Sequence, residues 1–298
     1  MWFKRIELCF SLLFIASYFT NKYVLSILKF TYPTLFQGWQ TIVGTLLLQI
    51  VWKLGWLELR SSFLWSAKIS WLPGALLFVG SIYAGSRALS KLPIPFFFML
   101  QSTSEVLATV TLKMTNKEKL SCTKIGSTVM IFTASAILLL NIHKNESDSF
   151  FWAVIHVTCA GGYKVFQKLK SCSLSEMEQQ YLSYLYSMAL LVCAAYPSGD
   201  AFDVLTFPFL SSYQFHSGCC ASGILGVSLK FLSVKLKNCV SKVRYGAWIL
   251  LTKVLATCLS LAAFEILLNI PTSCCLVLGM LGEALLIYTS ISESDINE

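Results

Sequence analysis

Residues 245–265 read Tyr-Gly-Ala-Trp-Ile-Leu-Leu-Thr-Lys-Val-Leu-Ala-Thr-Cys-Leu-Ser-Leu-Ala-Ala-Phe-Glu. A helix needs about 20 predominantly apolar residues to cross a lipid bilayer, and this run is long enough. It contains one lysine, Lys253, with roughly two helical turns of apolar residues on either side. A charge at this depth costs about 2.5–3.5 kcal/mol on insertion scales, so Lys253 is expected to face protein or a wet cavity. The alternative is a lysine whose ammonium group extends to the membrane interface, which is further than the side chain easily reaches.

The composition is that of an all-α, polytopic membrane protein. Of the 298 residues, 56% are hydrophobic and only 13% are charged, and the mean hydropathy is +0.67. A soluble domain carries about 25% charged residues, so a soluble globule is excluded. Apolar windows of spanning length predict about ten transmembrane helices. The predicted spans are residues 6–28, 33–52, 71–89, 93–112, 125–141, 150–166, 181–196, 219–236, 245–268 and 271–288.

The basic residues predict the orientation of these spans. Lysine and arginine accumulate in cytoplasmic connections. Here most of them lie on the side of the membrane that holds the N-terminus, such as Lys113, Lys117 and Lys119 in one connection, and Lys230 near the end of the eighth predicted span is counted with them. Both termini, including the acidic tail 291–298, are therefore expected in the cytoplasm. The net charge of +8 is explained by this topology and does not indicate a nucleic-acid partner.

No pattern for metal binding or catalysis is found in the sequence. The eleven cysteines include no Cys-x-x-Cys pair, and most lie inside apolar windows, where free cysteine acts as a small apolar side chain. The three histidines are too scattered to predict a metal site. There is also no phosphate-binding loop of the type used to hydrolyse nucleotides. We therefore expect no cofactor and no enzymatic activity.

A short internal repeat relates the two halves of the chain. Residues 104–109 read Ser-Glu-Val-Leu-Ala-Thr, and residues 252–257 read Thr-Lys-Val-Leu-Ala-Thr. The two copies are separated by almost half the chain, and each lies in the fourth of five predicted spans. An odd number of spans in each half turns the second half upside down in the membrane. This inverted repeat is an architecture of secondary transporters, whose substrates bind near the middle of the membrane between the repeats.

The repeat defines the expected organisation of the chain. We predict a single transporter domain made of pseudo-repeats 1–144 and 149–290, followed by a short acidic tail. Within it, Glu105 and Lys253 occupy equivalent positions with opposite charge. The sequence leaves open whether these two side chains form a pair.

A polar stripe runs along the fourth predicted span. Gln101, Glu105 and Thr109 are spaced four residues apart, which places them on one face of a helix. Such a stripe either binds neighbouring helices by hydrogen bonds or lines a cavity. The ionisable Glu105 favours the cavity, because charged groups inside a membrane mark substrate pathways.

The last two spans carry further candidate binding residues. Lys253, Thr257 and Ser260 share one face of the ninth span, next to Thr252. This face is the best candidate surface for a phosphate, which lysine binds as a point charge. Glu283 lies in the tenth span and is interpreted either as a binding residue or as a structural acid that bonds a neighbouring helix.

The seventh span begins with hydroxyl-bearing side chains. Tyr181, Ser183 and Tyr184 lie close together near its start. Tyrosines present a flat apolar face and a polar tip, which suits a sugar or a nucleobase. Tyrosines near a helix end are equally typical of the aromatic belt at a membrane interface, and both interpretations remain open.

Taken together, these motifs resemble those of nucleotide-sugar transporters in the drug/metabolite transporter superfamily, most closely the branch similar to GDP-mannose transporters. Residues 21–25, Asn-Lys-Tyr-Val-Leu, resemble the family's first helix, and residues 86–89, Ser-Arg-Ala-Leu, resemble its Ser-Lys-x-Leu segment. Lys253 resembles the lysine that closes the Gly-Ala-Leu-Asn-Lys motif. The resemblance implies that Lys253 binds nucleotide and that Asn21 and Lys22 belong to the substrate site.

The departures from the motifs bear on the substrate. Residues 249–253 read Ile-Leu-Leu-Thr-Lys where GDP-mannose carriers have Gly-Ala-Leu-Asn-Lys, and residues 181–184 read Tyr-Leu-Ser-Tyr where they have Phe-Tyr-Asn-Asn. Amides that would select guanine and mannose are thus replaced. The comparison favours a UDP-sugar, with UDP-N-acetylglucosamine as the first choice.

The resemblance implies a Golgi antiporter in contact with membrane lipid. It would exchange a cytosolic nucleotide sugar for a lumenal nucleoside monophosphate, without a metal or a catalytic residue. A homodimer is compatible with it. The alternatives are a GDP-mannose carrier, a carrier of sugar phosphates or other organic anions, and a membrane scaffold that transports nothing. If Lys253 is the main attraction for phosphate, Lys253→Met is expected to abolish transport and to leave folding intact.

Overall fold

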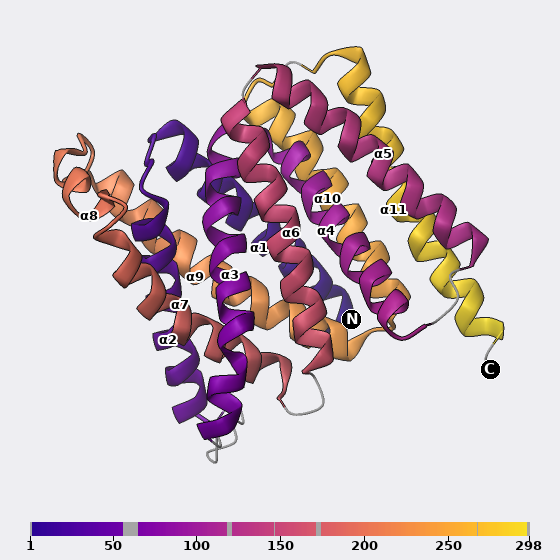
Figure 1. Cartoon of the computed structure of the whole chain (residues 1–298), viewed down its shortest axis with the longest axis horizontal. Helices are drawn as coiled ribbons and strands as arrows, with labels where there is room; N and C mark the ends of the chain where they lie inside the picture. The colour runs from indigo at the N-terminus through magenta and orange to yellow at the C-terminus, as the bar shows by residue number, and fades with distance from the viewer. Residues whose placement is uncertain are drawn as a thin grey trace.

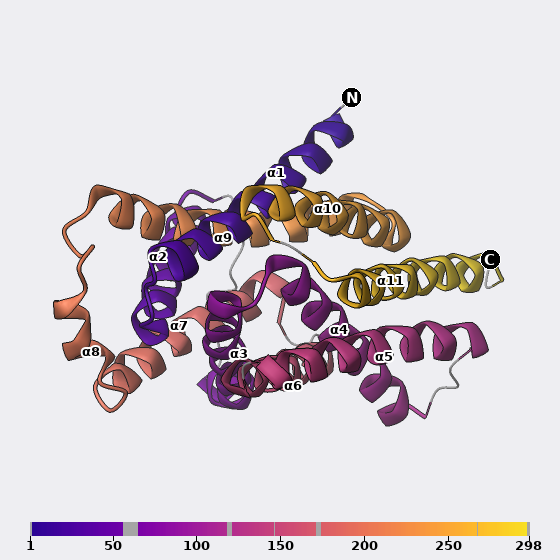
Figure 2. The same ribbon diagram turned by 90° about the horizontal axis from the view of Figure 1, so that it is seen from above.

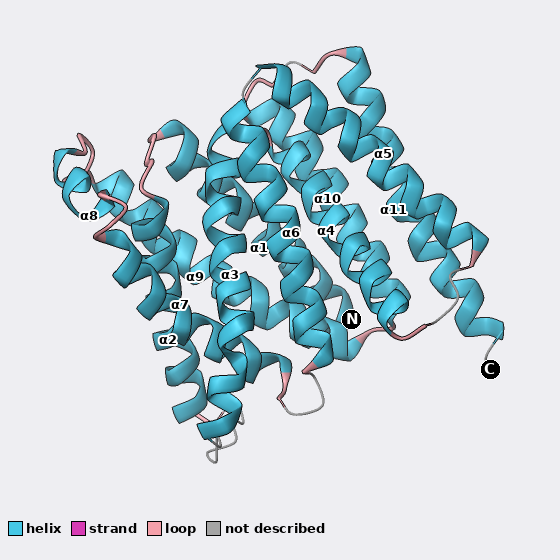
Figure 3. Ribbon diagram, in the orientation of Figure 1, coloured by secondary structure: helices cyan, strands magenta, loops and turns pink. Residues whose placement is uncertain are grey.

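The computed structural model describes residues 2–55, 65–117, 121–145, 147–170, 174–266 and 268–296. Helices make up nearly all of this part of the chain, and it contains no strand (Figure 3). The long helices of this part are α1 (Trp2–Lys22), α2 (Pro33–Lys53), α3 (Trp65–Lys91), α4 (Ile94–Thr115), α5 (Cys122–Asn145), α6 (Ser147–Leu169), α7 (Glu176–Ala195), α9 (Tyr213–Cys239), α10 (Lys242–Ala263) and α11 (Ile270–Ile296). Short elements are a π-helical turn (Tyr23–Ile27), α8 (Asp200–Asp203) and a 3₁₀ turn (Val204–Thr206).

The all-helical, membrane-spanning character expected from the sequence is confirmed. Each predicted window falls on one long helix. In the described residues, six helices are long and apolar enough to cross a membrane, and a seventh qualifies if α7 and the bent segment after it form one span. The chain is a multi-pass membrane protein. Helices α2, α4 and α6 are not among these six, and a total of ten spans stays a prediction.

One boundary differs from the predicted windows in a way that affects the site. The window at residues 245–268 predicts a helix to Leu268, whereas α10 begins at Lys242 and ends at Ala263. Glu265, two residues after the last residue of α10, has a φ of 50°, which is outside the right-handed helical region, so the helix cannot continue to Leu268. Lys253 consequently lies at the centre of α10, as far from one end as from the other.

Most of the long helices lie in two rows (Figure 2). In one row α3 packs against α6, and in the other α1 packs against α9. The pair α2 and α7 closes one side of the bundle, and the pair α5 and α11 closes the other. Helix α4 contacts α5 and α6, while α10 contacts α11 and α1. This packing also brings α4 against α10, the two helices that carry Glu105 and Lys253.

Both termini lie at the same end of the bundle, which is the lower end in Figure 1. The C-terminal ends of α2, α4, α6 and α9 reach this lower end, as do the N-terminal ends of α3, α5, α7 and α10. The opposite ends of these helices form the upper end. This alternation is what the predicted topology requires, because that topology places both termini on one side of the membrane.

A buried lysine joins α1 to α3 at the upper end. The ammonium group of Lys22 donates to the carbonyl oxygens of Leu89 and Leu92, each at 2.9 Å, and to that of Ser90 at 3.4 Å. The last carbonyls of a helix lack partners within the helix and attract cations. Lys22 therefore serves as a cap for the end of α3.

Aromatic and charged contacts complete the upper end. Phe30 packs against Phe207 and Phe215, with ring centroids 5.1 and 4.8 Å apart. Lys91 and Asp148 form an ion pair of 2.7 Å. The hydrogen bond from Lys91 holds the pKa of Asp148 below its usual range, so the pair stays ionised in a mildly acidic compartment. These contacts therefore join segments that are distant in the chain at the upper end.

Candidate functional site

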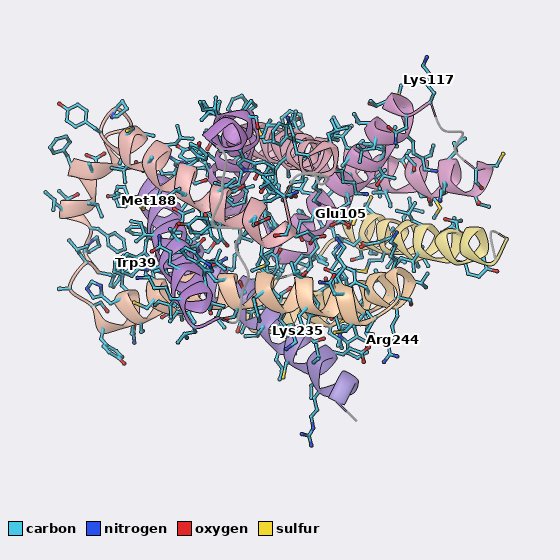
Figure 4. The ribbon with its side chains drawn as sticks, turned by 90° about the horizontal axis from the view of Figure 1, so that it is seen from below. Trp39, Glu105, Lys117, Met188, Lys235 and Arg244 are labelled. Atoms are coloured by element: carbon cyan, nitrogen blue, oxygen red, sulfur yellow. The ribbon has the colours of Figure 1, made fainter. Side chains whose placement is uncertain are left out.

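A cavity of about 790 Å³ occupies the lower half of the bundle between α4, α6, α7, α9, α10 and α11. Its volume is in the range of pockets that hold small molecules, about 300–1,000 Å³. It reaches the protein surface at Lys237 and Glu176, an ion pair whose side chains are 44% and 43% exposed. Seen from the lower end, Glu105 lies between the two rows of helices (Figure 4). We call this space the larger cavity.

At the inner part of the larger cavity lies a buried ion pair. The ammonium group of Lys253 is 2.6 Å from Glu283 Oε1 and donates to Ser102 Oγ at 3.0 Å. Ser102 in turn donates to Glu283 Oε2 at 2.7 Å. Glu283 lines the cavity, whereas Lys253 lies behind it and is only 3% exposed. A ligand in the cavity reaches the charge of Lys253 only by displacing the carboxylate of Glu283.

The predicted polar stripe of α4 divides into two parts. Glu105 and Thr109 line the larger cavity, and Glu105 pairs with Lys164 at 3.1 Å. Gln101 instead donates to the hydroxyl of Tyr18 at 2.6 Å and so joins α4 to α1. Glu105 and Lys253, the two pseudo-equivalent residues, each have a different ionic partner and are not paired with one another.

A lysine that the sequence analysis assigned to the cytoplasmic side proves to be central. Lys230 lies in α9 about 14 Å from the end of the helix, at 1.5 Å per residue. It lines the larger cavity, and among the described residues it forms no ion pair. By contrast, Lys164, Lys237 and Lys253 are each paired with an acid. The sequence feature that singled out Lys253, a lysine inside an apolar window, could also have identified Lys230 as a candidate binding residue.

A second cavity adjoins the first at Lys230. This smaller cavity, about 270 Å³, lies between α2, α3, α7 and α9. Tyr184, one of the predicted residues, lines it. Asn21, another, supports its wall, because it accepts hydrogen bonds from Gln40 at 3.2 Å and from Ser222 at 2.6 Å. Lys22, the neighbour of Asn21, lines neither cavity and caps α3 instead.

The other candidates on α10 face packed helices. Thr252 shares a hydrogen bond of 2.9 Å with Ser11 on α1. Ser260 is buried and donates to the carbonyl of Thr257 at 2.9 Å. The buried hydroxyl of Thr257 has no partner among the described residues. None of the three lines the larger or the smaller cavity.

Two candidates on α7 hold helices together. The hydroxyl of Tyr181 accepts a hydrogen bond of 3.0 Å from Gln49 on α2. Ser183 is fully buried and bonds Trp71 at 3.0 Å and Tyr163 at 2.7 Å. Of the hydroxyl-bearing cluster predicted on this helix, Tyr184 lines the smaller cavity, and Tyr181 and Ser183 line neither of the two cavities.

The chemistry of the two cavities is that of anion and polar-group binding. Within the described ranges, no group of histidine, cysteine, aspartate and glutamate side chains is placed to hold a metal ion. The cations available to a ligand are lysines, which bind phosphate as point charges. The arrangement can therefore bind a phosphorylated molecule.

The comparisons with known proteins agree with this chemistry. No model of a known protein family matches the chain. It is 50% identical over 291 residues to the UDP-N-acetylglucosamine transporter TMEM241 homolog of Xenopus laevis, which covers 97% of this chain and 98% of that protein. It is 49% identical over 285 residues to the UDP-N-acetylglucosamine transporter TMEM241 of Mus musculus, with 95% and 96% covered. The chain belongs to the nucleotide-sugar transporter family.

The family resemblance found in the sequence is thus confirmed. A more distant member, the GDP-mannose transporter of Komagataella pastoris, is 23% identical over 238 residues, or 76% of this chain and 72% of that protein. These relatives are named as transporters and not as enzymes. Within a nucleotide-sugar transporter, the lysine-lined cavity is the natural candidate for the substrate site.

Proposed function

We propose that this protein is a Golgi antiporter that exchanges cytosolic UDP-N-acetylglucosamine, or a similar UDP-sugar, for a lumenal nucleoside monophosphate. The observation that carries the proposal is the larger cavity, in which Lys230 is a cation with no ion pair among the described residues. Even a half-buried charge without an ionic partner is costly, and a phosphate that binds there offsets the cost. The names of the close relatives support the choice of substrate.

Phosphate binding involves two lysines, one without an ionic partner among the described residues and one that is paired with an acid. Lys230 faces the cavity and makes the first contact. Lys253 contributes when the phosphate competes with Glu283, whose carboxylate now lies 2.6 Å from the ammonium group. The substrate therefore replaces an internal anion, so the ion pair stabilises the empty carrier and is exchanged for a substrate contact when the carrier loads.

The packing of the helices supports the proposal of inverted repeats. If the first five long helices are exchanged with the last five, the pair α3–α6 becomes the pair α9–α1, and α4–α5 becomes α10–α11. The pairs α2–α7 and α5–α11 map onto themselves. All of these pairs are packed in the structure. A carrier of two related halves can alternate access by rocking one half against the other around a fixed site.

The structure corresponds to one state of such a cycle. The larger cavity reaches the lower end, while Lys22, the aromatic cluster around Phe30 and the pair Lys91–Asp148 close the upper end. The excess of lysine and arginine at the lower end favours a cytosolic location for it. We infer that the site is open to the cytosol and closed to the lumen.

The orientation can be tested with single cysteines at exposed positions. Lys117→Cys, at the lower end, is expected to react with a membrane-impermeant maleimide on intact Golgi vesicles. Tyr213→Cys, at the upper end and 85% exposed, is expected to react only after the vesicle membrane is permeabilised. The exposed native cysteines are first replaced by serine, and that background protein is the control. Labelling with the opposite pattern contradicts the orientation.

Substrate choice is tested by competition for uptake into proteoliposomes. Unlabelled UMP and UDP-N-acetylglucosamine are expected to reduce uptake of labelled UDP-N-acetylglucosamine more strongly than GMP and GDP-mannose do. The reason is that a site selective for guanine needs amides to hydrogen-bond the polar edge of that base, and this chain lacks them at the matching positions. Stronger competition by GMP favours a GDP-mannose carrier, competition by sugar phosphates favours an organic-anion carrier, and the absence of any uptake favours a scaffold.

A further inference from the structure

The outer face of α3 carries an arginine near the upper end of the bundle. Spacings of three, four, seven and four residues place five side chains on this one face of the helix: Ile69, Leu72, Leu76, Tyr83 and Arg87. The three aliphatic ones are exposed, and none of the five lines the larger or the smaller cavity. In a multi-pass membrane protein such a face lies against lipid. Arg87 is about 6 Å along the axis from the end of α3, which places it near the lipid headgroups.

Two aromatic rings flank the guanidinium group of Arg87. Its Cζ atom lies 5.9 Å from the ring centroid of Tyr83 and 5.9 Å from that of Trp152, on the neighbouring α6 (Figure 1). The two rings also contact one another, with centroids 5.4 Å apart. A cation–π contact attracts the charge of the guanidinium but satisfies none of its five N–H donors. Tryptophan and tyrosine are, in addition, the side chains that gather at membrane interfaces.

The donors of Arg87 find no acceptor among the described residues. Its side chain forms no ion pair or hydrogen bond with them, and its Nε atom is buried without a partner. The acid of this corner, Asp148, is already bonded at both oxygens, by Lys91 at 2.7 Å and by the indole of Trp152 at 2.9 Å. Arg87, Lys91 and Asp148 together therefore keep one net positive charge, and an acceptor from outside these residues is needed to satisfy Arg87.

We propose that Arg87, Tyr83 and Trp152 form a binding site for the headgroup of an anionic phospholipid, whose acyl chains lie along the exposed face of α3. The inference does not depend on the proposed substrate. Phosphate oxygens match the planar fork of a guanidinium, which binds them through two parallel N–H···O bonds. Phe151 widens the apolar surface, because it is 55% exposed and its ring lies 5.2 Å from that of Trp152. A phospholipid combines the two chemistries required, an anion at the interface and hydrocarbon beside the helix.

The position of Arg87 favours a lipid over a soluble anion. A soluble phosphate would contact the guanidinium alone and would gain nothing from Leu72 and Leu76, which are 41% and 54% exposed. A lipid is held in the interface by its own acyl chains, so its headgroup is presented to Arg87 at a high effective concentration. The two occupants can therefore be distinguished by competition between a phospholipid and its water-soluble headgroup.

The test is native mass spectrometry of the full-length protein in detergent, titrated with dioleoyl phosphatidylglycerol. Dioleoyl phosphatidylcholine has the same acyl chains and a headgroup without net charge, and the wild type is expected to bind it more weakly. Arg87→Gln is expected to weaken binding of the first phosphatidylglycerol by about tenfold or more, the range for losing a hydrogen bond to a charged group. Arg87→Lys keeps the charge but not the planar fork and is expected to lie between the two.

The matched control is Lys29→Gln, which removes the same charge from an exposed position at the same end of the bundle, outside α3 and α6. It is expected to bind phosphatidylglycerol like the wild type. Wild-type affinity in Arg87→Gln, or an equal loss in Lys29→Gln, would overturn the inference. Displacement of the lipid by glycerol 3-phosphate would do so as well, because it would assign the site to a soluble anion. Equal affinity of the wild-type protein for the two lipids overturns it without any variant.

Discussion

Replacing Lys253 with methionine is expected to abolish nucleotide-sugar uptake and to lower the melting temperature of the purified protein. Lys253 is 3% exposed, and Glu283 is its ionic partner at 2.6 Å. The variant leaves the Glu283 carboxylate without its cation, and breaking a buried pair in this way costs about 3–5 kcal/mol. The sequence alone predicted that folding would stay intact, and the ion pair changes that expectation.

The double variant Lys253→Met with Glu283→Gln separates the two effects. Neutralising the acid removes the uncompensated charge, so the melting temperature is expected to recover while uptake stays absent. Lys242→Met, at an exposed position at the start of α10, is the control and is expected to behave like the wild type in both measurements. Uptake at the wild-type rate in the double variant would show that Lys253 serves folding alone.

Replacing Lys230 with glutamine is expected to raise the KM for nucleotide sugars about 10- to 100-fold, the range for losing one hydrogen bond to a charged group. The melting temperature is expected to stay equal or to rise, because the described residues give Lys230 no ion pair and its charge is half-buried without compensation. Substrate affinity should therefore fall without any loss of stability, which distinguishes a binding residue from a structural one.

Two further variants define the role of Lys230. Lys230→Arg keeps the charge and is expected to retain part of the affinity, although arginine differs in shape. Lys235→Gln, on the same helix but exposed and outside both cavities, is the matched control and should leave KM unchanged (Figure 4). An unchanged KM in Lys230→Gln would contradict the placement of the phosphates between the cavities.

The sequence predicted the class of the protein and the location of its helices. Long apolar runs are local features, and they must be helical because the bilayer core holds no water to bond the backbone N–H and C=O groups, which therefore have to bond one another. The family followed from short motifs around residues 21–25, 86–89 and Lys253. The importance of Lys253 and Glu105 could also be predicted, since charges inside apolar windows are rare and need a partner or a cavity.

Other features depended on which helices meet. Lys253 pairs with Glu283 on α11, and Glu105 pairs with Lys164 on α6, so neither pair could be derived from spacing along one helix. Lys22 lies in a segment that resembles a family motif, and it was therefore predicted to bind substrate. In the fold the end of α3 lies beside it, and Lys22 caps that helix instead. Lys230 was counted as a cytoplasmic lysine although its window was apolar.

Sequence by itself determined what each segment is: apolar helices of spanning length, a few ionisable groups inside them, and the motifs of a transporter family. Only the tertiary structure decided which of those groups are neutralised by a neighbour and which face a cavity. The physical reason is that the cost of burying a charge is local, whereas the partner that offsets it comes from a helix distant in the chain. The smaller cavity is the clearest case, since α2, α3, α7 and α9 meet there only after the bundle has folded.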